Sequence, residues 1–473
     1  MRQVRRALVL CSVALAIVAA VRAQTPATPA ALTTDQLFSM TKVWNVHLTF
    51  TPEAWKSLMP PPAPTLAELG PRRPDEVGFV SQEGRRNGIS GYRGIEFEYV
   101  HAAIDFEGRQ FGDVAVRIKG NGSYSAVAKQ PKPSLKIDLN KFVKGQKIAG
   151  VSTLNLHNNL MDASFMNEVL AYRLYREAGT PAPRTAYARV YVTIKGAQTH
   201  AYQGLYSLVE NVDSNFTDEY YKVKGGAIFK PVTTVVFRDD GKDWAKYNQA
   251  YDPKTDLTPA DTGRVIEFAN LVTHASDQVF AARYGEFMDV EAFAKHMAVL
   301  VWIANPDSIL SQGQNFYIFL NPTTKKFAFI PWDQDHSFGQ FSPWRSPESQ
   351  QQLSLTRPWS PGSFPAQGQG RFLERTFALE AFKRPYLAKL AELNRTLARP
   401  ERLTAQVDQL ATFLAPIVPD EPITSRVDSF KLSLGEAPFP RPINVNVQLV
   451  PIRVFLKARH ASVQSQLQNL GVQ

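Results

Sequence analysis

Cysteine is almost absent from this sequence. The 473 residues contain one cysteine, Cys11, which lies in the apolar stretch at the start of the chain. The rest of the chain therefore cannot form a disulfide, and a hydrophobic core alone must hold it together. With 44% hydrophobic residues, a chain of this length can bury such a core, either as one large domain or as two lobes.

Long apolar runs are also missing. After residue 23 no stretch reaches the roughly 20 residues that a membrane-spanning helix needs, so we expect no transmembrane segment in the mature chain. The apolar run over residues 7–20 is shorter than this, follows three arginines and precedes the small residues of a cleavage site. This pattern predicts a bacterial secretory signal over residues 1–23, a flexible mature N-terminus over 24–40, and a secreted protein, periplasmic or extracellular.

Dense runs of positive charge are absent as well. The formal net charge is +10, and four of the arginines lie in the predicted signal, which leaves +6 for the mature chain. Proteins that bind nucleic acid carry clustered lysine and arginine. We therefore expect no nucleic-acid partner, although a mildly basic surface is compatible with an acidic one.

Several catalytic motifs do not occur. The sequence has no Walker motif, no Gly-x-Ser-x-Gly elbow, and no His-Glu-x-x-His or zinc-cluster spacing. The sequence therefore does not indicate a P-loop nucleotide site, a serine hydrolase of the elbow type or a zinc site. Without such spacing, four histidines are interpreted mostly as ordinary surface or core residues: His157, His274, His296 and His336.

Hydrophobic periodicity divides the chain into two halves. Alternating segments in the first half predict a mostly antiparallel sheet with one helix that ends near Ala178. The second half is mainly helical, with a hairpin at its centre. We therefore expect an α+β fold of two lobes. Its parts are a sheet-rich N-terminal lobe over 41–211, a mainly helical C-terminal lobe over 212–398 and a C-terminal helical extension over 399–473.

Polar residues flank the two strands of the predicted hairpin. The strands Phe316–Leu320 and Phe327–Pro331 are joined by a turn over residues 321–324, so their open ends should lie together. Asn315 precedes the first strand and Asp333 follows the second. We expect these two side chains to lie close together, where oxygen ligands can hold a hard cation such as Mg²⁺ or Mn²⁺.

Two further carboxylates stand near this predicted site. Asp335 lies two residues after Asp333, and in an extended segment both would point to the same face and could share one ion or hold two. Asp307, on the adjoining loop, could act as a general base that orients a hydroxyl near a metal-bound phosphate. A simpler interpretation is also open, in which Asp333 caps a loop and Asp307, which follows Pro306, forms a turn.

A lysine and a glutamate in the first half could form an ion pair. Lys136 lies on an alternating strand and can face a cleft, and Glu168 is the one acid in the middle of the predicted helix. Such a pair positions phosphates in phosphoryl transfer. The alternative is that both face solvent and never meet. The small-residue turn over 120–123 could let the backbone approach phosphates, or it could be an ordinary hairpin turn.

The order of these segments resembles a known family. It is similar to the CotH family, the spore-coat-type atypical protein kinases found secreted in many bacteria. The resemblance runs from about residue 41 to about residue 397 and implies a diverged protein-kinase-like fold that binds ATP and a divalent ion between two lobes. The blocks that carry it, in order, are RIKGNGSYS, SLKIDL, LNLHNNLMDASFMNEVLAYRLYREAGTPAPRTAYARVYV, YQGLYSLVENVD and NPDS…QNFYIFL…FAFIPWDQDHSFG.

The resemblance also implies roles for individual residues. Lys136 would bind phosphate, Glu168 would be its partner on the helix, and Asp307 would be the catalytic aspartate. Two departures stand out: Gln314 stands where relatives often have histidine, and an insertion over 71–93 has no recognised counterpart. The remaining implied roles are nucleotide contacts from Gly120, Asn121, Ser123 and Glu210, and metal ligands from Asn315, Asp333 and Asp335.

Together these features predict a secreted, Mg²⁺- or Mn²⁺-dependent ATP phosphotransferase that phosphorylates Ser or Thr of an exported or cell-surface protein. The alternative is a non-catalytic surface, coat-assembly or adhesion protein that uses the kinase-like scaffold for binding. A third interpretation, a metal-dependent hydrolase, lacks an evident second acid or base. The phosphotransferase is favoured because a non-catalytic scaffold does not need a complete set of phosphate-binding, catalytic and metal-binding residues. This set is Lys136, Glu168, Asp307, Asn315 and Asp333.

Overall fold

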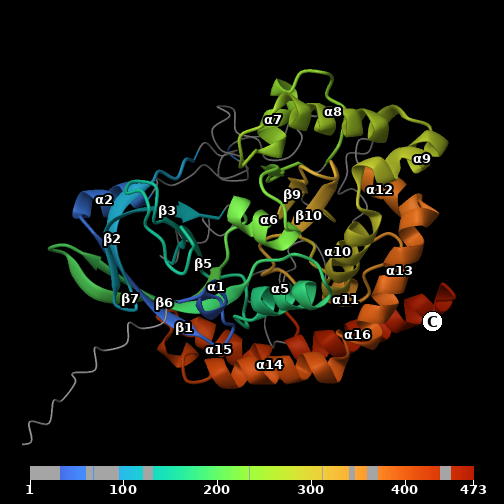
Figure 1. Ribbon diagram of the computed structural model, residues 1–473. Helices are drawn as coiled ribbons and strands as arrows, with labels where there is room; N and C mark the ends of the chain where they lie inside the picture. The colour runs from blue at the N-terminus through green and yellow to red at the C-terminus, as the bar shows by residue number, and fades with distance from the viewer. Residues whose placement is uncertain are drawn as a thin grey trace, which may run out of the picture.

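The computed structural model describes most of the chain (Figure 1). The described residues are 32–59, 68, 95–120, 132–233, 235–311, 313–339, 347–359, 371–436 and 449–472. The predicted signal over 1–23, the insertion over 71–93, and the predicted nucleotide contacts Asn121 and Ser123 lie outside these ranges. Within the predicted flexible N-terminus, a short helix, α1 (Thr34–Leu37), is capped by the side chain of Thr33.

The strands of the first half form a closed barrel, with a short helix, α2 (Pro52–Leu58), at its side (Figure 1). The order is β1-β2-β3-β4-β5-β7-β6, and β1 and β6 close the barrel as a parallel pair. Alternate side chains such as Ile118 and Ile137 fill a core of the barrel's own, as strand geometry requires. The strands are β1 (Val43–Phe50), β2 (Val100–Phe106), β3 (Arg109–Lys119), β4 (Ser134–Asp138), β5 (Thr153–His157), β6 (Thr185–Ile194) and β7 (Gln198–Val209).

The outer face of this barrel carries polar side chains on β3, β4 and β5. Arg117 on β3 pairs with Lys136 on β4, and Lys136 pairs with Asn155 on β5. Lys119 and His157 lie two residues further along β3 and β5, so they point to the same face. Both contact residues of the second half of the chain, and this outer face therefore forms one wall of the candidate site.

Helix α5 (Asn167–Glu177) lies between the barrel and the helical half (Figure 1). Its buried apolar residues, Leu174 among them, belong to the core of the helical half and not to the barrel core. The loop before the helix is ordered by Asp162, whose carboxylate accepts a hydrogen bond from the backbone N–H of Asn167 at 2.7 Å. The helix thus carries Glu168, in its first turn, to the junction of the two lobes.

The second half is mainly helical and contains a small antiparallel sheet of order β10-β9-β8. Its strands are β8 (Ala227–Phe229), β9 (Phe316–Leu320) and β10 (Phe327–Pro331). The helices around it are α6 (Ser214–Tyr221), α7 (Ala245–Tyr251), α8 (Pro259–His274), α9 (Asp277–Phe287), α10 (Val290–Ile303), α11 (Pro347–Gln351), α12 (Arg371–Ala378) and α13 (Glu380–Arg395).

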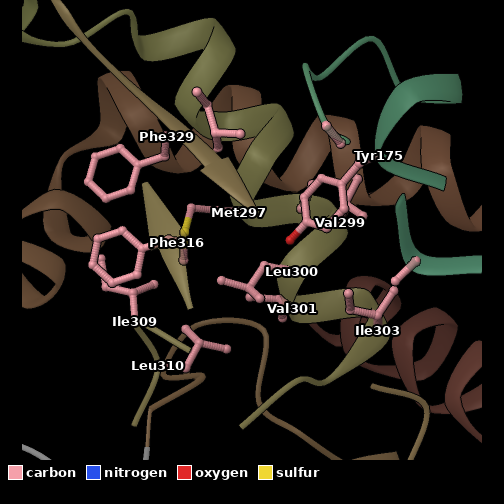
Figure 2. Packing of buried hydrophobic residues seen from close by; sticks show 14 of the residues in the cluster. Tyr175, Met297, Val299, Leu300, Val301, Ile303, Ile309, Leu310, Phe316 and Phe329 are labelled. Carbon is pink, nitrogen blue, oxygen red and sulfur yellow. The ribbon is translucent and has the colours of Figure 1, made fainter. Parts of the chain in front are cut away.

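Helix α10 and the β9–β10 hairpin pack against each other in the centre of this lobe. Met297 and Leu300 of α10 lie beside Phe316 of β9 and Phe329 of β10 (Figure 2). The rings of Phe293 and Phe329 are 4.7 Å apart. Because interiors are close-packed, this contact fixes the hairpin relative to α10 and to the loop that leaves it.

The C-terminal helices pack back across both lobes. Lys132, just before β4, forms a buried ion pair with Glu421 at 3.0 Å. Arg459 donates hydrogen bonds to the backbone carbonyls of Val301 and Trp302 at the end of α10, at 2.9 and 3.1 Å. This segment therefore connects the barrel to the helical core. Its elements are α14 (Pro400–Leu414), a short 3-10 helix (Val418–Asp420), α15 (Thr424–Ser433) and α16 (Ile452–Asn469).

The architecture confirms the predicted α+β class, with a sheet-rich N-terminal lobe and a mainly helical C-terminal lobe. The exact boundaries after residues 211 and 398 stay predictions. In the described part of the chain, no helix combines the length and the apolar character needed to cross a bilayer.

The Lys132–Glu421 pair should hold the C-terminal segment on the barrel. The two side chains are 2% and 0% exposed, and removing one leaves the other charge buried and unpaired, which costs about 3–5 kcal/mol. We expect Lys132→Met and Glu421→Gln each to lower the free energy of unfolding by this amount in urea denaturation. The double variant should recover part of the loss, and the exposed Lys56→Met is the control. Fully additive losses would contradict the pairing.

Candidate functional site

The hairpin brings the residues at its two open ends together. Phe316 pairs with Pro331, and one step further the backbone N–H of Trp332 donates to the carbonyl of Asn315 at 3.1 Å. Asn315 and Asp333 both have φ in the left-handed region, 63° and 52°, which Asn and Asp tolerate better than most residues. The predicted hairpin is present, and Asn315 and Asp333 stand at its mouth.

Asp307 is buried on the loop after α10 and is held from three directions. Its carboxylate accepts hydrogen bonds from Gln314 Nε2 and Asn315 Nδ2, both at 2.9 Å, and lies 3.2 Å from His336 Nδ1. Burial alone would raise the pKa of Asp307, but His336 and the two amides bring it below its usual value. The carboxylate is therefore ionised and fixed in orientation. Gln314, the residue that departs from the family pattern, helps to hold it.

His336 lies between two of the predicted carboxylates. Its Nδ1 faces Asp307, and its Nε2 is 3.7 Å from Asp335 Oδ1. Burial opposes a charge on the imidazole, but Asp335 and Asp307 raise the pKa of His336 to about 9. Burial, and then the charge of Asp333, raise the pKa of Asp335 well above its usual value, although His336 lowers it. The sequence interpretation of His336 as an ordinary histidine missed this bridge, which its position directly after Asp335 could have suggested.

A histidine links a lysine to Glu168. Lys119 Nζ contacts His157 Nε2, and His157 Nδ1 lies 2.8 Å from Glu168 Oε2 and 3.8 Å from Asp333 Oδ1. Burial lowers the pKa of Lys119 and of His157 and raises the pKa of Glu168. Strands β3 and β5, helix α5 and the hairpin therefore meet at one buried polar cluster. No metal or catalytic spacing in the sequence marks His157, because its partners come from other elements.

The lysine beside Glu168 is Lys119 and not Lys136. Lys136 is partly buried, and the groups that act on its charge are chiefly the cations Arg117, Lys119 and Lys254. Burial first, and then these cations, lower the pKa of Lys136 to about 8. Both lysines lie on the same face, but Lys119 is at the end of β3 nearer to the helix. The expected pair of Lys136 with Glu168 is therefore corrected, while a contact of Lys136 with phosphate stays a prediction.

The ring of Trp332 lies close to two lysines, one from each lobe. The ring centroid is 4.9 Å from Lys119 Nζ and 5.5 Å from Lys230 Nζ, distances at which a cation is attracted to an aromatic face. The rings of His157 and Tyr317 meet the indole edge-on, at 5.5 and 5.4 Å. Burial, and then the charges of Lys119 and Lys254, lower the pKa of Lys230 to about 7. Sequence reasoning did not single out Lys230.

The predicted nucleotide contacts are only partly described. Glu210 follows β7, and its carboxylate accepts hydrogen bonds from the backbone N–H and the Nε of Arg184, at 2.9 and 3.1 Å. Arg184 also pairs with Glu219 at 2.9 Å, so the Glu210 side chain serves to hold this arginine. Gly120 directly follows β3 and has a φ of 92°, a conformation that favours glycine. The proximity of either residue to a nucleotide stays a prediction.

The donor set at the hairpin mouth fits a divalent cation. Ligand atoms of His157, Glu168 and Asp333 lie within 4.8 Å of one another, but the ammonium of Lys119 already contacts this group. Asp333, whose side chain is 35% exposed, is accessible to an ion. With Asn315 and Asp335 it offers the oxygen donors that Mg²⁺ and Mn²⁺ prefer. Metal binding by these three residues stays a prediction.

Comparison with known proteins gives a family for this chain. A family model described as CotH kinase protein matches residues 116–431. The chain is similar to the inner spore coat protein H of Bacillus subtilis (strain 168), with 24% identity over 214 residues, which cover 42% of this chain and 53% of the relative. The match thus spans about half the length of this curated relative.

Among solved structures, the chain is similar to a chain of the Shewanella oneidensis MR-1 toxin–antitoxin complex of HipA, HipB and operator DNA. The identity is 13%, the TM-score is 0.32, and the match covers 78% of this chain and 76% of that chain. A TM-score this low supports no argument about fold or function.

Replacing the two lysines separately tests which one is coupled to Glu168. We expect Lys119→Met to lower the free energy of unfolding by about 1–3 kcal/mol, because His157 and the carboxylates lose their partner. Lys136→Met should change it by less than about 0.5 kcal/mol, since the charges nearest to Lys136 are mainly cations. Urea denaturation followed by tryptophan fluorescence measures both. Equal losses in the two variants would speak against Lys119 as the coupled residue.

Proposed function

The chain belongs to the CotH kinase family, and from this premise we propose that it is a divalent-metal-dependent phosphotransferase. It would transfer phosphate from ATP to Ser or Thr of an exported protein. The observation that carries this proposal is the convergence of a lysine, a helix glutamate and a group of carboxylates where the two lobes meet. Phosphoryl transfer needs positioning and charge neutralisation more than covalent chemistry, and this set of residues is suited to both.

In this proposal Lys119 binds the phosphates of ATP. Glu168, acting through His157, positions the lysine. The ring of Trp332 attracts the ammonium of Lys119 from a distance of 4.9 Å. Lys136 lies on the same barrel face, where it pairs with Arg117, two residues before Lys119, and its charge attracts the same phosphates. The buried glutamate therefore acts as a positioning residue, as the helix glutamate does in other kinases.

Asp307 is the proposed catalytic base. Its carboxylate is kept ionised and oriented by His336, Gln314 and Asn315, so it can accept the proton of a Ser or Thr hydroxyl. A divalent ion held by Asn315, Asp333 and Asp335 would neutralise charge on the transferred phosphate. The predicted signal over residues 1–23 supports an exported protein as the substrate.

A second candidate function is a non-catalytic role in surface or coat assembly, or in adhesion. It is favoured by one observation, the name of the similar Bacillus subtilis protein, an inner spore coat protein. Assembly does not require a buried, oriented carboxylate such as Asp307 next to a second acidic group, and for this reason we rank it below transfer.

Nucleotide binding is the first test of the proposed function. We expect ATP with Mg²⁺ or Mn²⁺ to raise the melting temperature of the purified protein, because a ligand that binds only the folded state stabilises it. Asp333→Asn should abolish the metal-dependent part of the shift. The matched control, Asp256→Asn, removes an exposed carboxylate of the same lobe and should leave the shift unchanged. No shift with either metal in folded wild-type protein would favour the assembly role.

A comparison of two aspartate variants separates binding from transfer. Asp307→Asn keeps the size of the side chain and loses one of the two oxygens that accept from Gln314 and Asn315. Because it also removes the base, we expect it to retain ATP binding and to lose transfer about 10²- to 10⁴-fold. Asp333→Asn should lose both. Transfer is measured as radiolabel moved from γ-labelled ATP to the protein itself or to exported proteins. An Asp307→Asn variant with wild-type transfer would rule out its role as the base.

A further inference from the structure

Lys230 is placed at the site by the small sheet of the helical lobe. It directly follows β8, and its backbone N–H donates to the carbonyls of Tyr251 and Asp252 at 3.0 and 3.2 Å. The main chain here is therefore held on the strand that pairs with the hairpin. The side chain is partly buried and ends above Trp332 and Tyr317, with 5.5 and 5.6 Å from Nζ to the two ring centroids.

The ammonium of Lys230 has no matching anion among the described residues. No hydrogen bond or ion pair to its Nζ occurs in that part of the chain. Two aromatic rings lie close to it, and the carboxylates of Asp333 and Asp252 act on its charge without bonding to it. Asp252 accepts the backbone N–H of Lys230 through its carbonyl, and its carboxylate is paired with Lys254 at 2.6 Å. A half-buried cation without an acceptor costs stability. Proteins retain such groups where a ligand supplies the missing partner.

The surroundings add further positive charge. Lys119 stands over the same indole ring as Lys230 but comes from the barrel. Lys136 and Arg117 lie in one row on the barrel face, and Lys254 acts on the charges of both Lys136 and Lys230. Cations from two lobes thus surround one place, beside Asp333 and Asp335 on the hairpin side. A multiply charged anion placed near Lys119 and Lys230 would also be attracted by the charges of the other cations.

We propose that Lys230 and Lys119 form a two-lobed clamp for the phosphate chain of the nucleotide, with both ammonium groups close to the ring of Trp332. This inference rests on the proposed function and adds to it a residue from the helical lobe. Each lysine donates charge-assisted hydrogen bonds to phosphate oxygens. Because the clamp recognises phosphate and not the base, inorganic tripolyphosphate should bind to it as well. Affinity should rise from AMP through ADP to ATP.

The test compares Lys230→Met with Lys224→Met, which removes an exposed lysine six residues earlier. The probes are ATP with Mg²⁺, inorganic tripolyphosphate with Mg²⁺, and adenosine, measured by calorimetric titration on the full chain. We expect Lys230→Met to weaken both phosphate probes about 10- to 100-fold and to leave adenosine unchanged. The ligand-free variant should melt at the same temperature as wild type or higher, because it loses a charge without a partner. Lys224→Met should match wild type in every measurement.

The outcomes separate this inference from the proposed function. Unchanged ATP and tripolyphosphate binding in Lys230→Met overturns the clamp and leaves the kinase proposal standing. If wild type binds tripolyphosphate but not ATP, and Lys230→Met loses the tripolyphosphate binding, the result supports the clamp and argues against the ATP-dependent function. A marked fall in the melting temperature of ligand-free Lys230→Met would show a structural role and overturn the clamp. Binding of neither probe by wild type overturns both proposals.

Discussion

Charges buried where the two lobes meet must compensate one another, and the arrangement of the site depends on this constraint. Lys119 from the barrel is the cation for a cluster in which His157 contacts Glu168 and approaches Asp333. Removing a charge from such a cluster leaves the others without a partner, at a cost of about 1–3 kcal/mol. The barrel, helix α5 and the hairpin are therefore held in one relative position by the same groups that are suited to bind phosphate.

Hydrophobic packing determines where these charges stand. The apolar residues of α5 belong to the core of the helical lobe although the helix lies within the sheet-rich half of the sequence. The hairpin packs on α10 through Phe293 and Phe329, and Asp307 is on the loop that leaves α10. Glu168 and Asp307 are thus fixed by the same core, so their relative position does not depend on the barrel. The lysines of the barrel face meet them where the two lobes pack together.

Local patterns predicted part of this site, and long-range packing decided the rest. The hairpin with Asn315 and Asp333 at its mouth could be predicted because short alternating strands and a turn are visible in the sequence. The choice between Lys119 and Lys136 could not be predicted, because both lie on the same face of alternating strands. Only the position of α5 shows which of the two is close to Glu168. His157 and His336 were missed for a related reason: their partners lie on other elements, apart from Asp335. The α+β class could be predicted from hydrophobic periodicity. The packing of the C-terminal helices against the barrel could not, because periodicity does not show which elements contact one another.

The C-terminal helices limit how far the two lobes can separate. Arg459 binds the end of α10, while Glu421 pairs with Lys132 and Arg426 donates to the carbonyl of Leu160 at 3.1 Å, both on the barrel side. Separating the lobes on this side would expose a buried ion pair and several arginine hydrogen bonds at once, which opposes wide opening. Groups that approach the site from opposite lobes therefore keep a nearly constant spacing. A phosphate chain that fits this spacing binds to a preorganised site, and little of its binding energy is spent on closing the lobes.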